Sequence, residues 1–567
     1  MKDNSPIFGI LSSQVGYGLE DAKRLLVRST NASSIAQGTP WDIQDARGSN
    51  MLSGKFTYWG DIWGSFWWVA DFTELKKPGR YRLFFYDNSG AVSQSDPLTI
   101  AEDPFWQSAV EHMALGQLER RARLAEAKVG WMDAGMPWQE ANAHASMVMG
   151  LLDLLERSEK NLTDMQTERL TTQIINGCDY MCLLQDEAAH RGQMAGGLSH
   201  MIPRFEDEVI LPDASKAAAS WAMAARLLPT QYSEKAEDYV HRSVRALSFC
   251  RTALPDNSIG YNRHQRGLDS SYNPPRHDTM TRELLMRLHA CVEIASDDRS
   301  PLSAEELGFI HEEAIILARE AMSRQCAEDE AVVGLYGFFF EFSDRHHMEP
   351  SWAHQIMGRP IGVDAGATYP QWVMPFFMLL RLWPDHADAV DWAGTLRRFA
   401  YGYLLPACSR NPFFIAPLMV HPDHGLIHFV GPWHGMNCVY GLTAAIAMEF
   451  AKWTGDSAFR EVAIGNLQWI SGLNAGVTRE SLTACHLFSM DIPEGRALSA
   501  SMIYGVGDRC AGNWTTIRGS VCNGFAVGDQ FVFDVPVSSV NDGPFQLTDE
   551  DWIPHASGFL SGMVRLK

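Results

Sequence analysis

The chain has 567 residues, of which 46% are apolar, and a formal net charge of −21. This length and composition predict a globular protein with one large core and a smaller companion domain. The negative charge argues against nucleic acid and anionic membranes as partners, because long-range repulsion would oppose both, and a neutral ligand is expected instead.

The first ten residues, MKDNSPIFGI, lack the basic region and apolar core of a secretory leader. The cytoplasm is therefore the expected location, with secretion as the alternative if a leader has been removed. No stretch approaches the ~18 uninterrupted apolar residues of a membrane span, so no membrane partner is expected. The ten cysteines lack zinc-site spacing and several lie in apolar runs, which favours buried thiols over a disulfide or a metal site.

Short runs of alternating apolar residues, separated by Gly, Asn, Pro and Ser, characterise the first part of the chain. They include RLLVR (24–28), FWWVADF (66–72), YRLFFY (81–86) and PLTI (97–100). Roughly seven such strands in ~100 residues are typical of an immunoglobulin-like β-sandwich. The first domain is therefore predicted to span residues 1–102.

After residue 102 the apolar period changes from two to 3.6, which predicts helices. The expected helices fall near 106–127, 138–157, 164–188, 214–228, 233–252, 279–296, 303–324, 367–383, 386–404, 436–454, 457–473 and 552–566. Twelve helices in consecutive pairs fit an all-α (α/α)6 toroid over residues 103–567. The long intervals 255–278, 325–366, 405–435 and 475–550 are rich in aromatics and His, and we expect them to form a cleft at one end.

Five stretches, in order along the chain, resemble glycoside hydrolase family nine, the cellulase and cellodextrinase family. They are SQVGYGLEDAKRLLVRS (13–29), WWVADFTELKKPGRYRLFF (67–85), GWMDAG (130–135), TGDSAFREVAIGNLQWISGLNAG (454–476) and DEDWIPHASGFLSGMVRL (549–566). The first two are similar to the family's immunoglobulin-like domain. The third is similar to its G-W-x-D-A-G-D motif, and the last aligns with the segment that carries its catalytic acid.

The resemblance implies an inverting glycoside hydrolase, in which one carboxylic acid protonates the leaving oxygen and a carboxylate on the other face activates water. It places Glu550 on the acid and Asp133 on the carboxylate that helps to hold the water. Met136 stands where the family has its base, so Asp133 is expected to take that role. The family's H-H-R substrate motif is missing, and Arg509, Arg518 and Asn513 are found instead.

Each of these carboxylates also has a structural interpretation. Glu550 could simply complement the positive end of the following helix, and Asp133 could cap the helix that begins near Trp138. Glu140 lies one helical turn beyond Met136, where it is either a displaced base or a surface residue at a helix start.

Aromatic residues and histidines of the expected cleft are candidates for substrate binding. Trp131 and Trp138 flank the D-A-G turn and could stack on sugar rings, although core packing is the alternative. Trp433 and His434 start an expected inner helix, and His347 lies in another His-rich loop. No helix-spaced pair of His ligands appears, so hydrogen bonding to sugar hydroxyls or proton transfer is favoured over metal binding.

The leading functional hypothesis is exo-acting hydrolysis of short β-linked oligosaccharides, because polymers do not enter the cytoplasm. A phosphorylase or a lyase on the same fold stays open, since Met136 removes the usual base, and so does a non-catalytic sugar-binding protein. No cofactor is expected. Structural calcium is possible, and the oligomeric state is left open.

Overall fold

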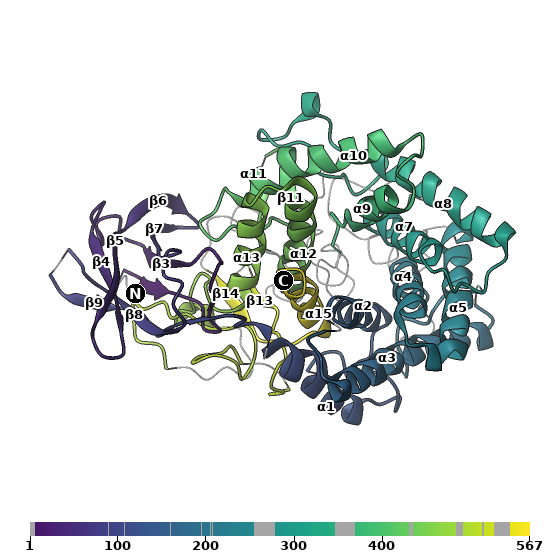
Figure 1. The fold of residues 1–567 in the computed structure, drawn as a ribbon, viewed down its shortest axis with the longest axis horizontal. Helices are drawn as coiled ribbons and strands as arrows, with labels where there is room; N and C mark the ends of the chain where they lie inside the picture. Colours follow the sequence, from purple (N-terminus) through teal and green to yellow (C-terminus); the bar gives the residue numbers. More distant parts are fainter. Residues whose placement is uncertain are drawn as a thin grey trace.

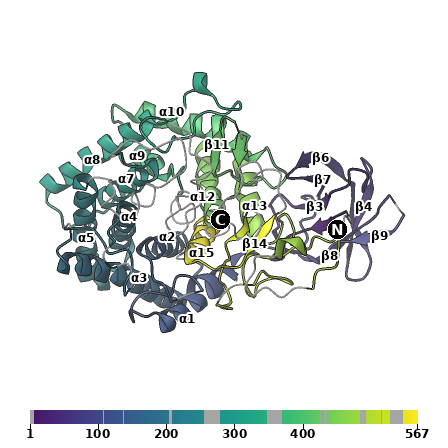
Figure 2. The same ribbon diagram turned by 180° about the vertical axis from the view of Figure 1, so that it is seen from behind.

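A computed structural model describes residues 6–88, 90–106, 108–135, 137–158, 160–193, 195–203, 206, 208–253, 278–345, 369–423, 425–429, 435–482, 491–512, 515–526 and 545–567. An N-terminal block of strands lies beside a ring of helices (Figure 1). The chain ends in the wall of the ring that is nearest to the strands, next to α12 and α15, and the view from behind shows the same arrangement (Figure 2). This order of strands and then helices agrees with the change of apolar period along the sequence.

The N-terminal strands form two sheets. One has the order β1 (Phe8–Leu11), β3 (Arg24–Ser29), β7 (Ser65–Asp71) and β6 (Thr57–Ile62). The other has the order β2 (Tyr17–Gly18), β10 (Leu98–Ala101), β8 (Gly79–Tyr86), β4 (Pro40–Asp45) and β5 (Asn50–Lys55), with β9 (Val92–Gln94) paired to β8. The predicted division at residue 102 falls between β10 and the first helical turn, which begins at Ser108.

Adjacent side chains of β3 and β7 serve two different cores, because neighbouring residues of a strand point to opposite faces. Leu25, Val27 and Trp68 pack between the two sheets. Leu26 and Trp67 belong to the core of the helical domain. One face of this sheet is therefore covered by helices and not by solvent, so the two domains share an apolar interface.

The helical ring has an inner and an outer layer. Inner helices are α2 (Ala141–Ser158), α4 (Leu211–Leu227), α7 (Thr281–Ala295), α9 (Met374–Leu382), α12 (Asn437–Thr454) and α15 (Ile553–Met563). The helices that flank them are α1 (Gln117–Leu124), α3 (Asp164–His190), α5 (Ser233–Thr252), α8 (Ala304–Ser323), α10 (Ala389–Arg398), α11 (Leu405–Cys408) and α13 (Ala458–Ile470). π-helical turns η1 (Ser108–Gly116) and η5 (Phe399–Leu404) precede α1 and α11.

Burial explains which helices are inner. Every residue of α4 from Leu211 to Ala225 is buried, whereas α5 buries mainly one face. The inner helices pack in the order α12, α15, α2, α4, α7 and α9. Phe377 of α9 contacts Phe450 of α12 with ring centroids 4.9 Å apart, which closes the ring.

All inner helices begin at the same end of the ring, since a returning outer helix separates each from the next. Two small hairpins complete the described structure: β11 (Met419–His421) with β12 (Gly425–Ile427), and β13 (Gly524–Ala526) with β14 (Gln546–Thr548). β14 leads directly into α15, so this hairpin lies at the end where inner helices begin. Among the described residues, no helix is both long and apolar enough to cross a membrane.

Candidate active site

The GWMDAG loop joins α1 to α2 and is shaped by close packing. Gly130 has φ of 74°, and a Cβ there would lie 2.7 Å from His144 and from Tyr180. Trp131 is fully buried, and its indole N–H donates to Gln173 Oε1 at 2.8 Å. The prediction that Trp131 stacks on a sugar is therefore wrong for this structure, because its ring packs parallel to His144 in the core.

Asp133 lies just before α2 and is buried, with 1% of its surface exposed. Its Oδ2 accepts the backbone N–H of Glu140 at 2.7 Å, and its own N–H donates to the backbone oxygen of Trp138. Burial raises the pKa of Asp133 to about 6, although the Glu140 N–H, Arg121 and His200 act in the opposite direction. The residue thus makes the bond expected of a cap, and it also has a pKa suited to a general base near neutral pH.

Glu550 is the middle residue of the DED triplet that precedes α15. Its neighbours Asp549 and Asp551 are fully buried, whereas Glu550 is only partly buried. The side-chain amide of Asn523 donates to Glu550 Oε2 at 3.0 Å, and the backbone N–H of Asn523 donates to the Glu550 backbone oxygen at 2.7 Å. Of the three acids, Glu550 is therefore the one that a substrate can reach.

Arg121 of α1 holds the two acidic loops together. One Nη donates to the backbone oxygens of the two residues that flank Asp133, at 3.1 and 3.2 Å. The other donates to the Asp551 carboxylate at 2.5 Å, and both partners are fully buried. The backbone N–H of Ile553 also donates to the Asp133 backbone oxygen at 2.8 Å. Segments more than 400 residues apart in sequence are thus fixed side by side at one end of the ring.

A further cluster of charges lies beside Asp133. His200 bonds through Nδ1 to Asp213 Oδ2 at 2.8 Å, and its Nε2 lies 3.9 Å from Glu140 Oε1. Burial alone would lower the pKa of His200, but Asp213 and then Glu140 raise it to about 10. The imidazole is therefore a cation at neutral pH. This ion pair shows that Glu140 is more than a solvated residue at a helix start, and its role as a base stays a prediction.

Comparison with known proteins identifies the fold. No family model matches the chain, and no curated protein does. Solved structures that match include a metagenome-derived glycoside hydrolase family 9 endoglucanase, with 16% identity, a TM-score of 0.63 and 98% of each chain covered. A Bacteroides ovatus GH9 protein has 15% identity, a TM-score of 0.59 and 98% of each chain covered. AaCel9A in complex with a cellobiose-like isofagomine has 14% identity, a TM-score of 0.59 and 99% of each chain covered.

The chain has the fold of glycoside hydrolase family nine. This confirms the resemblance and the fold class that the sequence predicts, an immunoglobulin-like domain followed by an (α/α)6 barrel. The match covers both domains and nearly the full length of each chain. At these low identities it establishes the family-nine fold but not the reaction.

Two other predicted substrate-binding residues, Trp138 and Arg518, are described on this fold, together with Arg509. Trp138 is half-buried, so part of its surface is accessible beside Asp133. Arg518 is exposed and lies near His112, whose pKa is lowered by burial and then by the Arg518 charge. Arg509 forms an ion pair with Asp96 of the immunoglobulin-like domain, so its guanidinium joins the two domains. Sugar binding by Trp138 and Arg518 stays a prediction.

Several predicted residues lie outside the described parts of the family-nine fold. They are Met136, His347, Trp433, His434 and Asn513. Within the described parts, no group of three or more His, Cys, Asp or Glu side chains is arranged to hold a metal ion. Calcium binding therefore stays a possibility raised by the sequence only.

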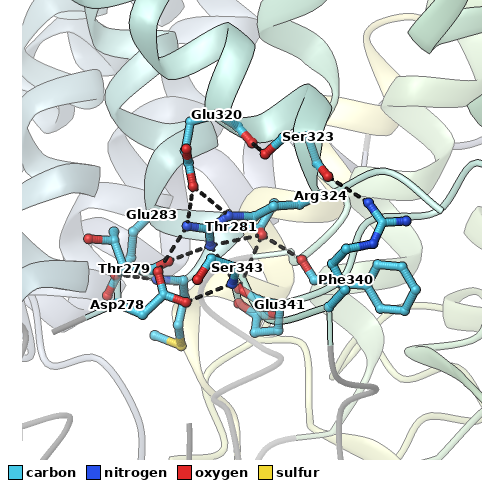
Figure 3. A network of polar contacts seen from close by, with 12 residues as sticks. Asp278, Thr279, Thr281, Glu283, Glu320, Ser323, Arg324, Phe340, Glu341 and Ser343 are labelled. Atoms are coloured by element: carbon cyan, nitrogen blue, oxygen red, sulfur yellow. Dashed lines mark hydrogen bonds and ion pairs between the residues drawn. The ribbon is translucent and has the colours of Figure 1, made fainter. Parts of the chain in front are cut away.

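A second polar network lies at the start of α7, at the same end of the barrel (Figure 3). Arg324, which follows α8, donates to the carboxylates of Glu320 at 2.7 Å and Asp278 at 3.0 Å. It also donates to the backbone oxygens of Thr279 and Glu341, at 2.5 and 3.3 Å. Arg324 is almost fully buried. The network thus fastens the end of α8 to the start of α7 and to the chain near residue 341.

A cavity of about 500 Å³ lies among the inner helices of the barrel. Its lining begins in the second helical turn of α2, α4, α7 and α15, but in the first turn of α9 and α12, at Met374 and Cys438. Ion pairs among these helices, such as Arg565 with Asp153 and Arg226 with Glu293, form part of its wall. The cavity therefore extends to Cys438, whose backbone N–H bonds His555, although neither Asp133 nor Glu550 is among its described lining residues.

Proposed function

We propose that the protein is an inverting glycoside hydrolase that acts on β-linked oligosaccharides from a chain end. The observation that supports it best is the pairing of Glu550, the accessible acid of its triplet, with Asp133 through loops that Arg121 binds together in a family-nine fold. In this proposal Glu550 is the acid and Asp133 the base that inversion requires.

The proposed reaction assigns one proton transfer to each carboxyl group. Glu550 gives its proton to the glycosidic oxygen as the bond to the anomeric carbon breaks. Asp133 takes a proton from the water that attacks the opposite face of the same carbon. The pKa of about 6 of Asp133 leaves it mostly ionised at pH 7, as a base must be.

Two isosteric variants test the assignment. Glu550→Gln and Asp133→Asn should each lower kcat on β-linked gluco-oligosaccharides by about 10²-fold or more, because general acid or base catalysis contributes that much. Glu168→Gln, an exposed residue of α3, is the matched control and should keep full activity. If the wild-type protein releases no sugar from such a panel, or if Glu550→Gln stays active, the proposal fails.

Product size decides between exo and endo action. The metagenome-derived relative is described as an endoglucanase, so attack within a glucan is the alternative mode. Exo action predicts mono- or disaccharides from the first minutes with little loss of viscosity in a soluble glucan. An early fall in viscosity with mixed oligosaccharide products would instead indicate endo action.

The same assays separate the other reactions that the sequence leaves open. Turnover that requires inorganic phosphate would indicate a phosphorylase. New ultraviolet absorbance from an unsaturated uronate would indicate a lyase. Calorimetric binding of oligosaccharides without any product would indicate a sugar-binding protein.

A further inference from the structure

A series of three hydrogen bonds leads from α12 to Glu550, and the first two of them are buried. The backbone N–H of Cys438 donates to Nδ1 of His555 at 2.9 Å. His555 Nε2 lies 2.8 Å from Asn523 Oδ1, and Asn523 Nδ2 lies 3.0 Å from Glu550 Oε2. His555 and Asn523 are both fully buried. Of the four residues that these bonds join, only Glu550 is predicted to be functional from the sequence.

The direction of every bond follows from the first one. A backbone N–H can only donate, so His555 Nδ1 must be the unprotonated acceptor and Nε2 must carry the hydrogen. Nε2–H then donates to the oxygen of Asn523, which fixes the orientation of the amide. The amide NH₂ group must therefore face Glu550. Protonation of Nδ1 would lose the Cys438 bond, so this series of bonds favours the neutral form of His555.

The backbone around Asn523 is held equally firmly. Gly435 packs against it so closely that a Cβ there would lie 2.1 Å from the Asn523 backbone oxygen. On the preceding residue, Cys522, the backbone oxygen accepts the side-chain amide of Asn437 at 2.7 Å. Asn523 thus has little freedom to turn its amide away from Glu550.

We propose that Asn523 and His555 are positioning residues that determine which oxygen of Glu550 carries the transferable proton. A carbonyl oxygen is a better acceptor than a hydroxyl oxygen, so the Asn523 N–H favours the form of Glu550 in which Oε2 is the carbonyl oxygen and Oε1 carries the acidic hydrogen. Oε1 is then the atom that gives its proton to the glycosidic oxygen. This assignment rests on the proposed function, in which Glu550 is the general acid.

Variants of both residues test this series of bonds. Loss of a hydrogen bond to an ionisable group costs about 1.5–3 kcal/mol, so Asn523→Ala should lower kcat by about 10- to 100-fold with little change in KM. The N–H of Asn523 stabilises the ionised carboxylate of Glu550, so its removal should raise the pKa of Glu550. The alkaline limb of the pH profile should therefore move to higher pH. His555→Gln can still donate to Asn523 and should retain more activity than His555→Leu.

The control is Asn466→Ala, a buried Asn of α13 whose amide bonds two backbone oxygens. It should unfold at a lower temperature, as Asn523→Ala does, without any shift of the pH profile. Equal kcat losses in Asn523→Ala and Asn466→Ala, or equal activity of His555→Gln and His555→Leu, would overturn the proposal.

A second readout does not depend on activity. The carboxyl carbon of Glu550, assigned by comparison with Glu550→Gln in protein with labelled Glu, reports its titration by NMR. Asn523→Ala should raise the pKa of Glu550, and an unchanged titration would overturn the positioning role. If the wild-type protein hydrolyses nothing but the titration shifts, the proposed function fails while the contact between Asn523 and Glu550 stands.

Discussion

Asp133 shows how one side chain can meet a structural and a chemical requirement together. Its Oδ2 accepts the N–H of Glu140 at the start of α2, and the same burial that makes this bond strong raises the pKa to about 6. A buried carboxylate that receives a backbone N–H and faces Arg121 would be an inert cap if its pKa were low. The raised pKa keeps proton exchange possible near neutral pH.

We predict that the acid limb of the pH profile for kcat/KM lies at about pH 6, because Asp133 must be ionised to accept a proton from water. The measurement is initial rates from pH 4 to 8 on a short β-linked oligosaccharide. An acid limb at pH 4 or below would contradict the assignment of Asp133 as base.

The same pKa affects stability, whatever the reaction is. The folded-state pKa of about 6 lies above the ordinary 3.8, so the stability that protonated Asp133 provides is present below pH 4 and is lost as the pH rises through 6. Asp133→Asn removes this dependence. The melting temperature of the variant minus that of the wild type should therefore increase from pH 4 to pH 7.

At the scale of elements, buried charges fasten helix ends to loops that are distant in the sequence. Arg121 does this between α1, the GWMDAG loop and α15, and Arg324 does it between α8 and α7 (Figure 3). Neither role could be read from the sequence, because an Arg in an amphipathic helix is normally a solvated residue. The partners come from segments that only the closed ring brings together.

Arg324→Met is predicted to destabilise the protein by about 3 kcal/mol, because it leaves the largely buried carboxylate of Asp278 without its ion-pair partner. Chemical unfolding followed by tryptophan fluorescence measures the loss. Arg319→Met, on the same helix, is the control: Arg319 pairs with Asp388 at the surface, and its removal should cause no measurable change. Equal effects of the two variants would contradict the structural role of Arg324.

At the scale of the molecule, the immunoglobulin-like domain and the barrel share one core. The hairpin between β6 and β7 turns at Trp63 and Gly64, both with positive φ, as a two-residue turn of type I′ requires. Trp is a rare residue in this conformation. Its ring lies among those of Phe413, Phe429, Trp469 and Phe545 in the helical domain. Packing between the domains therefore compensates for the backbone strain.

Trp63→Ala should cost about 3–5 kcal/mol, as other large-to-small changes of buried aromatics do. Calorimetry should show one transition, shifted to lower temperature as a whole, since both domains lose a shared contact. Tyr86→Ala, at an exposed position on β8, should leave the transition unchanged. A separate early transition of the N-terminal domain alone would show that the two cores unfold independently.

Sequence patterns predicted the elements well and the side-chain roles less well. The predicted helix 233–252 coincides with α5 (Ser233–Thr252), and 436–454 differs from α12 by one residue. Both rest on apolar periodicity, which is a local property. Trp131 was misjudged, because a Trp beside an Asp-Ala-Gly turn looks the same in sequence whether its ring faces a ligand or Gly177 and His144.

The sequence by itself determined the order of strands and helices, the family-nine fold and the two acidic motifs, since each depends on residues close together in the chain. Only the tertiary structure decided which acid of the DED triplet is accessible, that Arg121 joins this triplet, through Asp551, to the loop of Asp133, and that Asn523 and His555 orient Glu550. Burial and the direction of a hydrogen bond depend on partners hundreds of residues away. No local pattern carries that information.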